Sequence, residues 1–140
     1  MLQELTPFVM KHWALCAGFI VVAILVVIEE VRAGGPSPNR LSPAEATHLM
    51  NREDAVVIDV RDANVFREGH IVNAKNIALV DFDRGIEKLN RERPVILVDA
   101  IGDKTAALIE RLKKAGFKKP CAIKNGMNGW KTAEMPIVKK

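Results

Sequence analysis

The chain contains no tyrosine, and aromatic residues occupy only 5% of its 140 positions. Surfaces that bind nucleic acid commonly interleave basic and aromatic side chains, so the composition argues against a nucleic-acid partner. Cysteine is also scarce, with only Cys16 and Cys121 present. Cys16 falls within a long apolar run and Cys121 within a predicted strand, so we expect no intramolecular disulfide.

No strong excess of either charge is present, because the formal net charge of +4 is modest and the basic residues are spread along the chain. A loose basic group comprises Lys113, Lys114, Lys118 and Lys119, with Lys139 and Lys140 at the end. These residues form either a solvated surface or a contact with anionic lipid headgroups, to which each nearby basic residue adds about 1 kcal/mol.

One long hydrophobic run is present near the start of the chain. Residues 13–28 contain no charge and no proline, and residues 8–10 extend the run if Lys11 snorkels toward the headgroups. A membrane-spanning helix needs roughly 20 apolar residues. We therefore predict a transmembrane anchor over residues 1–33, with the lipid bilayer as a partner. A buried core helix is the less favoured alternative, because no apolar helical face elsewhere in so small a chain would surround it.

A cleaved signal peptide is the second alternative, since residues 31–33 end the run where a signal peptidase could act. The apolar core exceeds the usual length of about 7–15 residues, which favours an anchor.

Lys11 flanks one end of the run, and Arg32 and Arg40 flank the other. The positive-inside bias then predicts a single-pass protein of a bacterial-type inner membrane, with its domain in the cytoplasm.

Residues 34–40 form the predicted linker, because their glycines and prolines end any helix, and a domain follows over residues 41–140. A flexible linker of this length would keep the domain within roughly two nanometres of the bilayer. The first helix of the domain is predicted to run to about Asn51. Ser42 is its N-cap, Pro43 takes the first helical position, and Glu45 completes a capping box.

Strand-like and helical patterns alternate along the domain. Strands are predicted over residues 55–60, 74–79, 94–98 and 121–123, and helical segments over 61–68, 81–91, 105–115 and 125–130. This alternation predicts an α/β fold with a central parallel sheet covered by helices on both faces. Ligand sites in such sheets lie at the carboxyl ends of the strands, so Asp59, Asp99 and the residues after Ile123 should share one edge.

Three phrases in a fixed order resemble the rhodanese-homology domain. The first is VIDVR at residues 57–61, followed by FREGHI at 66–71 and by Ala74 and Asn76. The second is the strand at 94–98 and its loop, with Gly102 in place. The third runs from residues 116–117 through the strand at 121–123 to NGMNGW at 125–130 and MPIV at 135–138. The resemblance covers roughly residues 40–138 and implies a rhodanese-like sheet flanked by helices.

In catalytic members of that family, a cysteine opens the loop after the second of these strands, and loop N–H groups surround the sulfur that it carries. In this chain the position holds Asp99, and a basic residue often found late in the loop falls on Lys104. The family's paired glycine before the last helical turn reads Asn125-Gly126, a further departure. The resemblance thus implies a degenerate loop, formed by Asp99, Ala100, Ile101, Gly102, Asp103 and Lys104, in which Asp99 and Lys104 are the candidate binding residues.

Asp99 stands in place of the cysteine on which sulfur transfer depends. A soft thiolate must attack sulfur and hold it as a persulfide, and a carboxylate has no comparable chemistry. Cys121 is expected to lie roughly 10–13 Å from the loop, and Cys16 would lie in lipid. We therefore assign no catalytic residue and predict that the usual sulfurtransferase activity is absent.

Asp99 itself has two interpretations. Its carboxylate could accept the N–H bonds of its own loop and gain about 0.3–1 kcal/mol from the following helix dipole, or it could recognise a basic partner or a cation. Asp103 could join it on a metal, but two carboxylates without a histidine are too few ligands, so we predict no metal and no cofactor. We expect His70, Asp59 and Arg61 to fix loops and a strand end by hydrogen bonds, not to catalyse.

A phospho-accepting receiver domain is a different alternative, because Asp59, Asp99 and Lys124 all follow predicted strands. Asp99 would then be phosphorylated with Mg²⁺, and Asp59 and Asp62 would form the acidic pair. The segment after Asp99 lacks room for the additional strand and helix that this fold needs, which argues against it.

These observations favour a membrane-anchored, catalytically inactive rhodanese-like domain that binds or regulates a membrane or secretory protein. The alternative is a thiosulfate or persulfide sulfurtransferase that uses an atypical active loop or an imported thiol.

Overall fold

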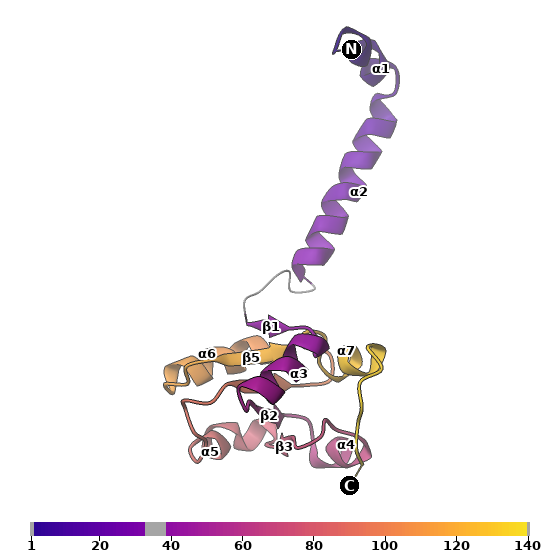
Figure 1. Cartoon of the computed structure of the whole chain (residues 1–140). Helices are drawn as coiled ribbons and strands as arrows, with labels where there is room; N and C mark the ends of the chain where they lie inside the picture. Colours follow the sequence, from indigo (N-terminus) through magenta and orange to yellow (C-terminus); the bar gives the residue numbers. More distant parts are fainter. Residues whose placement is uncertain (1, 33–38, 140) are drawn as a thin grey trace. The chain divides into compact units, whose positions relative to one another are not determined.

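The apolar sequence near the N-terminus forms two helices, α1 (Leu2–Lys11) and α2 (Trp13–Arg32), drawn in indigo to violet in Figure 1. The computed structural model describes residues 2–32 and 39–139 and divides the chain into two units, residues 1–37 and 38–140. None of the residues of α2 is buried, so α2 is not the core helix of a soluble domain. Its 20 residues are long and apolar enough to cross a membrane, as also expected of a signal sequence.

The second unit contains a five-stranded sheet in the order β1-β5-β4-β2-β3. All of its paired strands are parallel, which confirms the predicted α/β fold. The strands are β1 (Arg40–Leu41), β2 (Val56–Asp59), β3 (Lys75–Asn76), β4 (Val95–Val98) and β5 (Pro120–Ile123). Every residue of β2, β4 and β5 is buried, which explains why these strands read as continuous apolar runs.

Helices cover both faces of this sheet. One core cluster joins Ile58 and Leu97 to α5 (Phe82–Ile86) and α6 (Thr105–Lys114). The other joins Val57 and Ile96 to α3 (Pro43–Arg52) and α7 (Gly126–Thr132). Neighbouring residues of a strand thus enter opposite clusters, as the period of two requires. The remaining helical segments are α4 (Ala63–Glu68) and the 3₁₀ turn η1 (Leu79–Asp81).

The start of α3 follows the sequence prediction. The Ser42 N–H donates to Oε2 of Glu45 at 2.7 Å, and the Glu45 N–H donates to Oγ of Ser42 at 3.2 Å. These reciprocal bonds form the predicted capping box.

Three predicted boundaries were wrong. The helix predicted over 81–91 is only Phe82–Ile86, because Gly85 weakens it and the Asn90 side chain accepts the Glu92 N–H at 2.9 Å. The strand predicted over 74–79 is only Lys75–Asn76, since η1 begins at Leu79. Arg40, assigned to the linker, belongs to β1, and residues 34–38 of that linker lie outside the described residues.

Candidate functional site

The carboxyl ends of β2 and β4 meet at one edge of the sheet, as the strand rule predicts. Asp59 at the end of β2 pairs in register with Val98, directly before Asp99. A cavity of about 320 Å³ lies at this edge, which we call the loop cavity. It is lined by Val60, Arg61, Asp62, Val65, Leu79, Asp99, Ala100, Ile101, Asp103 and Lys104.

Asp99 lies at the inner end of the loop and is only 3% exposed. The Gly102 N–H donates to its Oδ1 at 2.6 Å, and the Lys104 N–H donates to its Oδ2 at 3.0 Å. Burial raises the pKa of this carboxyl, although the two amide bonds act in the opposite direction, and the neighbouring Asp103 raises it further. The loop thus encloses its own carboxylate, and the first interpretation of Asp99 matches the observed hydrogen bonds.

The first residues of α7, after the turn that follows β5, form backbone hydrogen bonds with this loop. The Met127 N–H donates to the Asp99 carbonyl at 2.8 Å, and the Asn128 N–H donates to the Ala100 carbonyl at 3.1 Å. Gly126 has φ +54°, and a Cβ at this position would collide with the Asp99 carbonyl oxygen and lie 2.7 Å from its Oδ1. Asn125, where the family has a glycine, has φ 61°. Asparagine tolerates this left-handed conformation, so the departure from the paired glycine keeps the turn.

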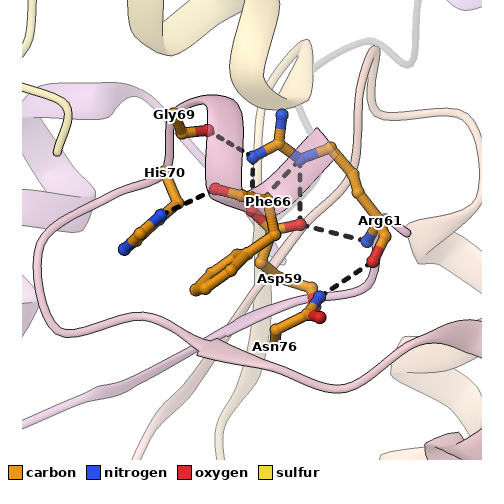
Figure 2. A network of polar contacts seen from close by, with 6 residues as sticks. All are labelled: Asp59, Arg61, Phe66, Gly69, His70 and Asn76. Atoms are coloured by element: carbon orange, nitrogen blue, oxygen red, sulfur yellow. Dashed lines mark hydrogen bonds and ion pairs between the residues drawn. The ribbon is translucent and has the colours of Figure 1, made fainter. Parts of the chain in front are cut away.

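Asp59 and Arg61 hold the end of β2 by charge-assisted hydrogen bonds, as predicted. Figure 2 shows the Arg61 guanidinium between the Asp59 carboxylate, 2.7 Å from Oδ2, and the Gly69 carbonyl, 2.8 Å away. Asp59 is fully buried, and the Asn76 side chain donates to the carbonyls of Asp59 and Arg61 at 3.1 and 2.8 Å. Both charged side chains are thus bonded to protein groups at the end of β2.

His70 also has a structural place. Its Nδ1 donates to the Phe66 carbonyl at 2.7 Å, and its ring stacks on the Phe66 ring with centroids 3.8 Å apart (Figure 2). Its backbone exchanges two 2.9 Å hydrogen bonds with Val138. His70 is absent from the lining of the loop cavity, which agrees with the expected loop-fixing role.

The remaining predicted residues, Ile101 and Lys104, lie on the exposed side of the loop. Ile101 is 54% exposed, and the Lys104 side chain forms no ion pair with any described residue. Val65 of α4 and Leu79 of η1 also line the cavity. The sequence did not predict these two residues, because their place in the lining depends on how α4 and η1 pack against the loop.

No thiol lines the loop cavity. Cys121 is buried in β5, within the cluster that faces α3 and α7, and burial raises the pKa of its thiol. Cys16 lies in α2. Within residues 2–32 and 39–139, no group of three or more histidine, cysteine, aspartate or glutamate side chains could hold a metal ion.

Comparison with known proteins gives a consistent set of relatives. Residues 42–133 match the family model described as a rhodanese-like domain. The Escherichia coli K12 protein YibN, which is uncharacterised, is 32% identical over 142 residues, covering 99% of each chain. The thiosulfate sulfurtransferase GlpE of Coxiella burnetii is 30% identical over 92 residues, covering 66% of this chain and 86% of that protein.

Solved structures show the same fold. A rhodanese-related protein from Thermoplasma volcanium superposes with a TM-score of 0.67 at 22% identity, over 73% of this chain and 99% of that one. The polysulfide-sulfur transferase homodimer from Wolinella succinogenes gives a TM-score of 0.62 at 26% identity, over 72% of this chain and 78% of that one. These matches rule out the receiver-domain alternative. The chain belongs to the rhodanese-like domain family.

Proposed function

We propose that this chain is a membrane-anchored rhodanese-like domain without sulfurtransferase activity, which binds or regulates a neighbouring membrane or secretory protein. The observation that carries the proposal is the Asp99 carboxylate. It receives the Gly102 and Lys104 N–H groups, at 2.6 and 3.0 Å, at the loop position where catalytic members of the family hold sulfur.

The chemistry of the loop supports inactivity. A persulfide forms when a thiolate attacks sulfur, and an oxygen carboxylate does not carry sulfur in this way. Cys121 cannot replace the missing thiol because it is 4% exposed and belongs to the core beneath α3 and α7. Cys16 lies within the apolar helix α2.

Exposed apolar side chains around the loop cavity support a binding role. Val65, Leu79 and Ile101 line this cavity and are 41%, 37% and 54% exposed, and Val80 beside Leu79 is 91% exposed. Apolar side chains grouped in this way on a surface are typical of interaction sites. If α2 spans the membrane, the tether raises the effective concentration of the domain toward neighbouring membrane proteins.

A second candidate function is favoured by the similarity to GlpE, which is a thiosulfate sulfurtransferase. In this case the chain would transfer sulfur from thiosulfate or a persulfide through an atypical loop or an imported thiol. The two candidate functions therefore predict different results when sulfur transfer by the loop is assayed.

The first test measures thiocyanate formed from thiosulfate and cyanide by the full chain in nonionic detergent micelles. We expect no turnover above that of buffer, and no change in the Asp99→Ala variant. Turnover that Asp99→Ala abolishes would contradict the proposal and favour the sulfurtransferase.

The second test restores a thiol. In Asp99→Cys, the Gly102 and Lys104 amides should stabilise the thiolate and lower its pKa below about 8.5, the value of a free cysteine. We expect the residue 99 thiolate to attack the outer sulfur of thiosulfate and release sulfite, which leaves one added sulfur atom as a persulfide, measured by intact mass and peptide mapping. Asp103→Cys, in the same loop, and native Cys121 are the matched controls and should stay unmodified. Absence of a persulfide at residue 99 would mean that the loop no longer has the geometry of a catalytic relative.

A further inference from the structure

A second cavity lies beside the loop and shares only Ile101 with the loop cavity. Its volume is about 490 Å³, and we call it the α7 basin. Its walls come from the turn between β1 and α3, the turn between β5 and α7, and α7 itself. The side chains that matter below are Ser42, Ile101, Lys124, Asn125, Asn128 and Thr132.

Backbone contacts hold the walls of the α7 basin together. Leu41 and Ile123 are register partners on the neighbouring strands β1 and β5, and the Lys124 N–H donates to the Leu41 carbonyl at 2.8 Å. Ser42 and Lys124 therefore follow adjacent strand ends. The Asn128 N–H donates to the Ala100 carbonyl at 3.1 Å, which ties α7 to the loop.

Several polar side chains of the α7 basin make no polar contact with other described residues of the chain. Lys124, Asn125, Asn128 and Thr132 are exposed, and in the part of the chain that the structure describes their side chains form no ion pair or hydrogen bond. No acidic residue lines this basin. The loop cavity differs, because Asp99 and Arg61 there are bonded to protein groups.

We propose that the α7 basin binds a phosphate ester. Lysine is a common phosphate ligand, and carboxamides and hydroxyls donate to phosphate oxygens. A phosphate presents more acceptor oxygens than a carboxylate, so it uses more of the four unpaired donors. Ile101 and Pro43 provide apolar surface for the organic part of the ester.

The phosphate ester could come from an anionic phospholipid headgroup or from a small soluble metabolite. The site is separate from the Asp99 carboxylate, so the inference goes beyond the proposed function and does not depend on the absence of sulfur transfer.

The experiment uses the full isotope-labelled chain in nonionic micelles, titrated with glycerol 3-phosphate and followed by the NMR signals of Lys124, Asn125 and Asn128. We expect saturable shifts of these signals, and none with glycerol. Lys124→Gln should weaken binding roughly tenfold, because it removes the only charged donor of the basin. Lys131→Gln is the matched control, since Lys131 is an exposed residue of α7 that does not line the basin.

A second arm separates the two sources in nanodiscs of phosphatidylglycerol or phosphatidylcholine. Shifts of the same signals only with phosphatidylglycerol indicate a lipid headgroup, whereas shifts only with glycerol 3-phosphate indicate a soluble ester. Either result supports the site. Absence of saturable shifts with every probe, or equal affinity in Lys124→Gln and the unmodified chain, overturns it. The sulfur-transfer assay is independent of these readouts, so the two proposals can fail separately.

Discussion

Asp99 places a titratable carboxyl in a buried position, where it accepts hydrogen bonds from two backbone amides and lies beside Asp103. Burial raises its pKa, the Gly102 and Lys104 amides lower it in part, and Asp103 raises it again. A carboxyl whose pKa is higher in the folded chain than in the unfolded chain binds protons more tightly when folded. Its ionisation therefore reduces the free energy of unfolding.

We predict that Asp99 makes the chain less stable as the pH rises from about 3.9, the ordinary pKa of aspartate, through its own raised pKa. Asp99→Asn cannot ionise, so the free energy of unfolding of the unmodified chain should fall relative to this variant over that range. Denaturation in micelles at stepped pH, followed by Trp130 fluorescence in a Trp13→Phe background, measures the difference.

Asp103→Asn is the control for the same series. It removes the neighbouring carboxylate, which lowers the pKa of Asp99 in the folded chain, so the decline should end at a lower pH and be smaller. Parallel stability curves for the unmodified chain and Asp99→Asn would show that Asp99 titrates alike in the folded and unfolded chains.

Among the elements, α3 depends on its N-cap residue, Ser42. Ser42 satisfies the Glu45 N–H, and the Glu45 carboxylate satisfies the Ser42 N–H. Helices leave their first N–H groups without intrahelical partners, so such a cap contributes directly to stability.

We predict that Ser42→Ala lowers the free energy of unfolding by about 1 kcal/mol, whereas Ser42→Gly lowers it by only about a few tenths. Glycine adopts the cap conformation and leaves the amides open to water, which explains the difference. The same fluorescence-detected denaturation measures both variants. Equal losses for alanine and glycine would assign the effect to contacts other than the cap.

At the scale of the whole molecule, the chain joins an apolar helical unit to a rhodanese-like unit. The 20 residues of α2 suit a membrane span, and none of them is buried by the protein. An anchor and a cleaved signal sequence lead to different positions of the mature domain.

We predict that the full chain stays in the membrane pellet after alkaline carbonate washing of cells that express it. Replacing Ile20 and Ile24 with lysine should release it, because each charge near the helix centre costs roughly 2.5–3.5 kcal/mol on insertion. A variant with the same substitutions at the exposed surface residues Val65 and Val80 should remain bound. A mature N-terminus at Gly34 would instead show cleavage.

The sequence predicted local features well wherever neighbouring residues decide the structure. The capping box at Ser42 depends on residues three apart, and the apolar runs of β2 and β4 reflect burial on both faces. The sequence predicted that Asp59 and Arg61 fix a strand end by charge-assisted hydrogen bonds, and the strand rule placed Asp59 and Asp99 at the same edge. The positions of Val65 and Leu79 in the lining of the loop cavity could not be predicted, because they depend on how α4 and η1 pack against the loop.

The sequence by itself determined the parallel α/β pattern, the apolar helix and the carboxylate at residue 99, because these depend on residue type and short-range periodicity. The tertiary structure decided the pairing of β1 with β5 and the meeting of Ser42, Ile101 and Lys124 around the α7 basin. These features require contacts between segments far apart in the chain. The residue pattern of one segment does not say which distant segment it contacts.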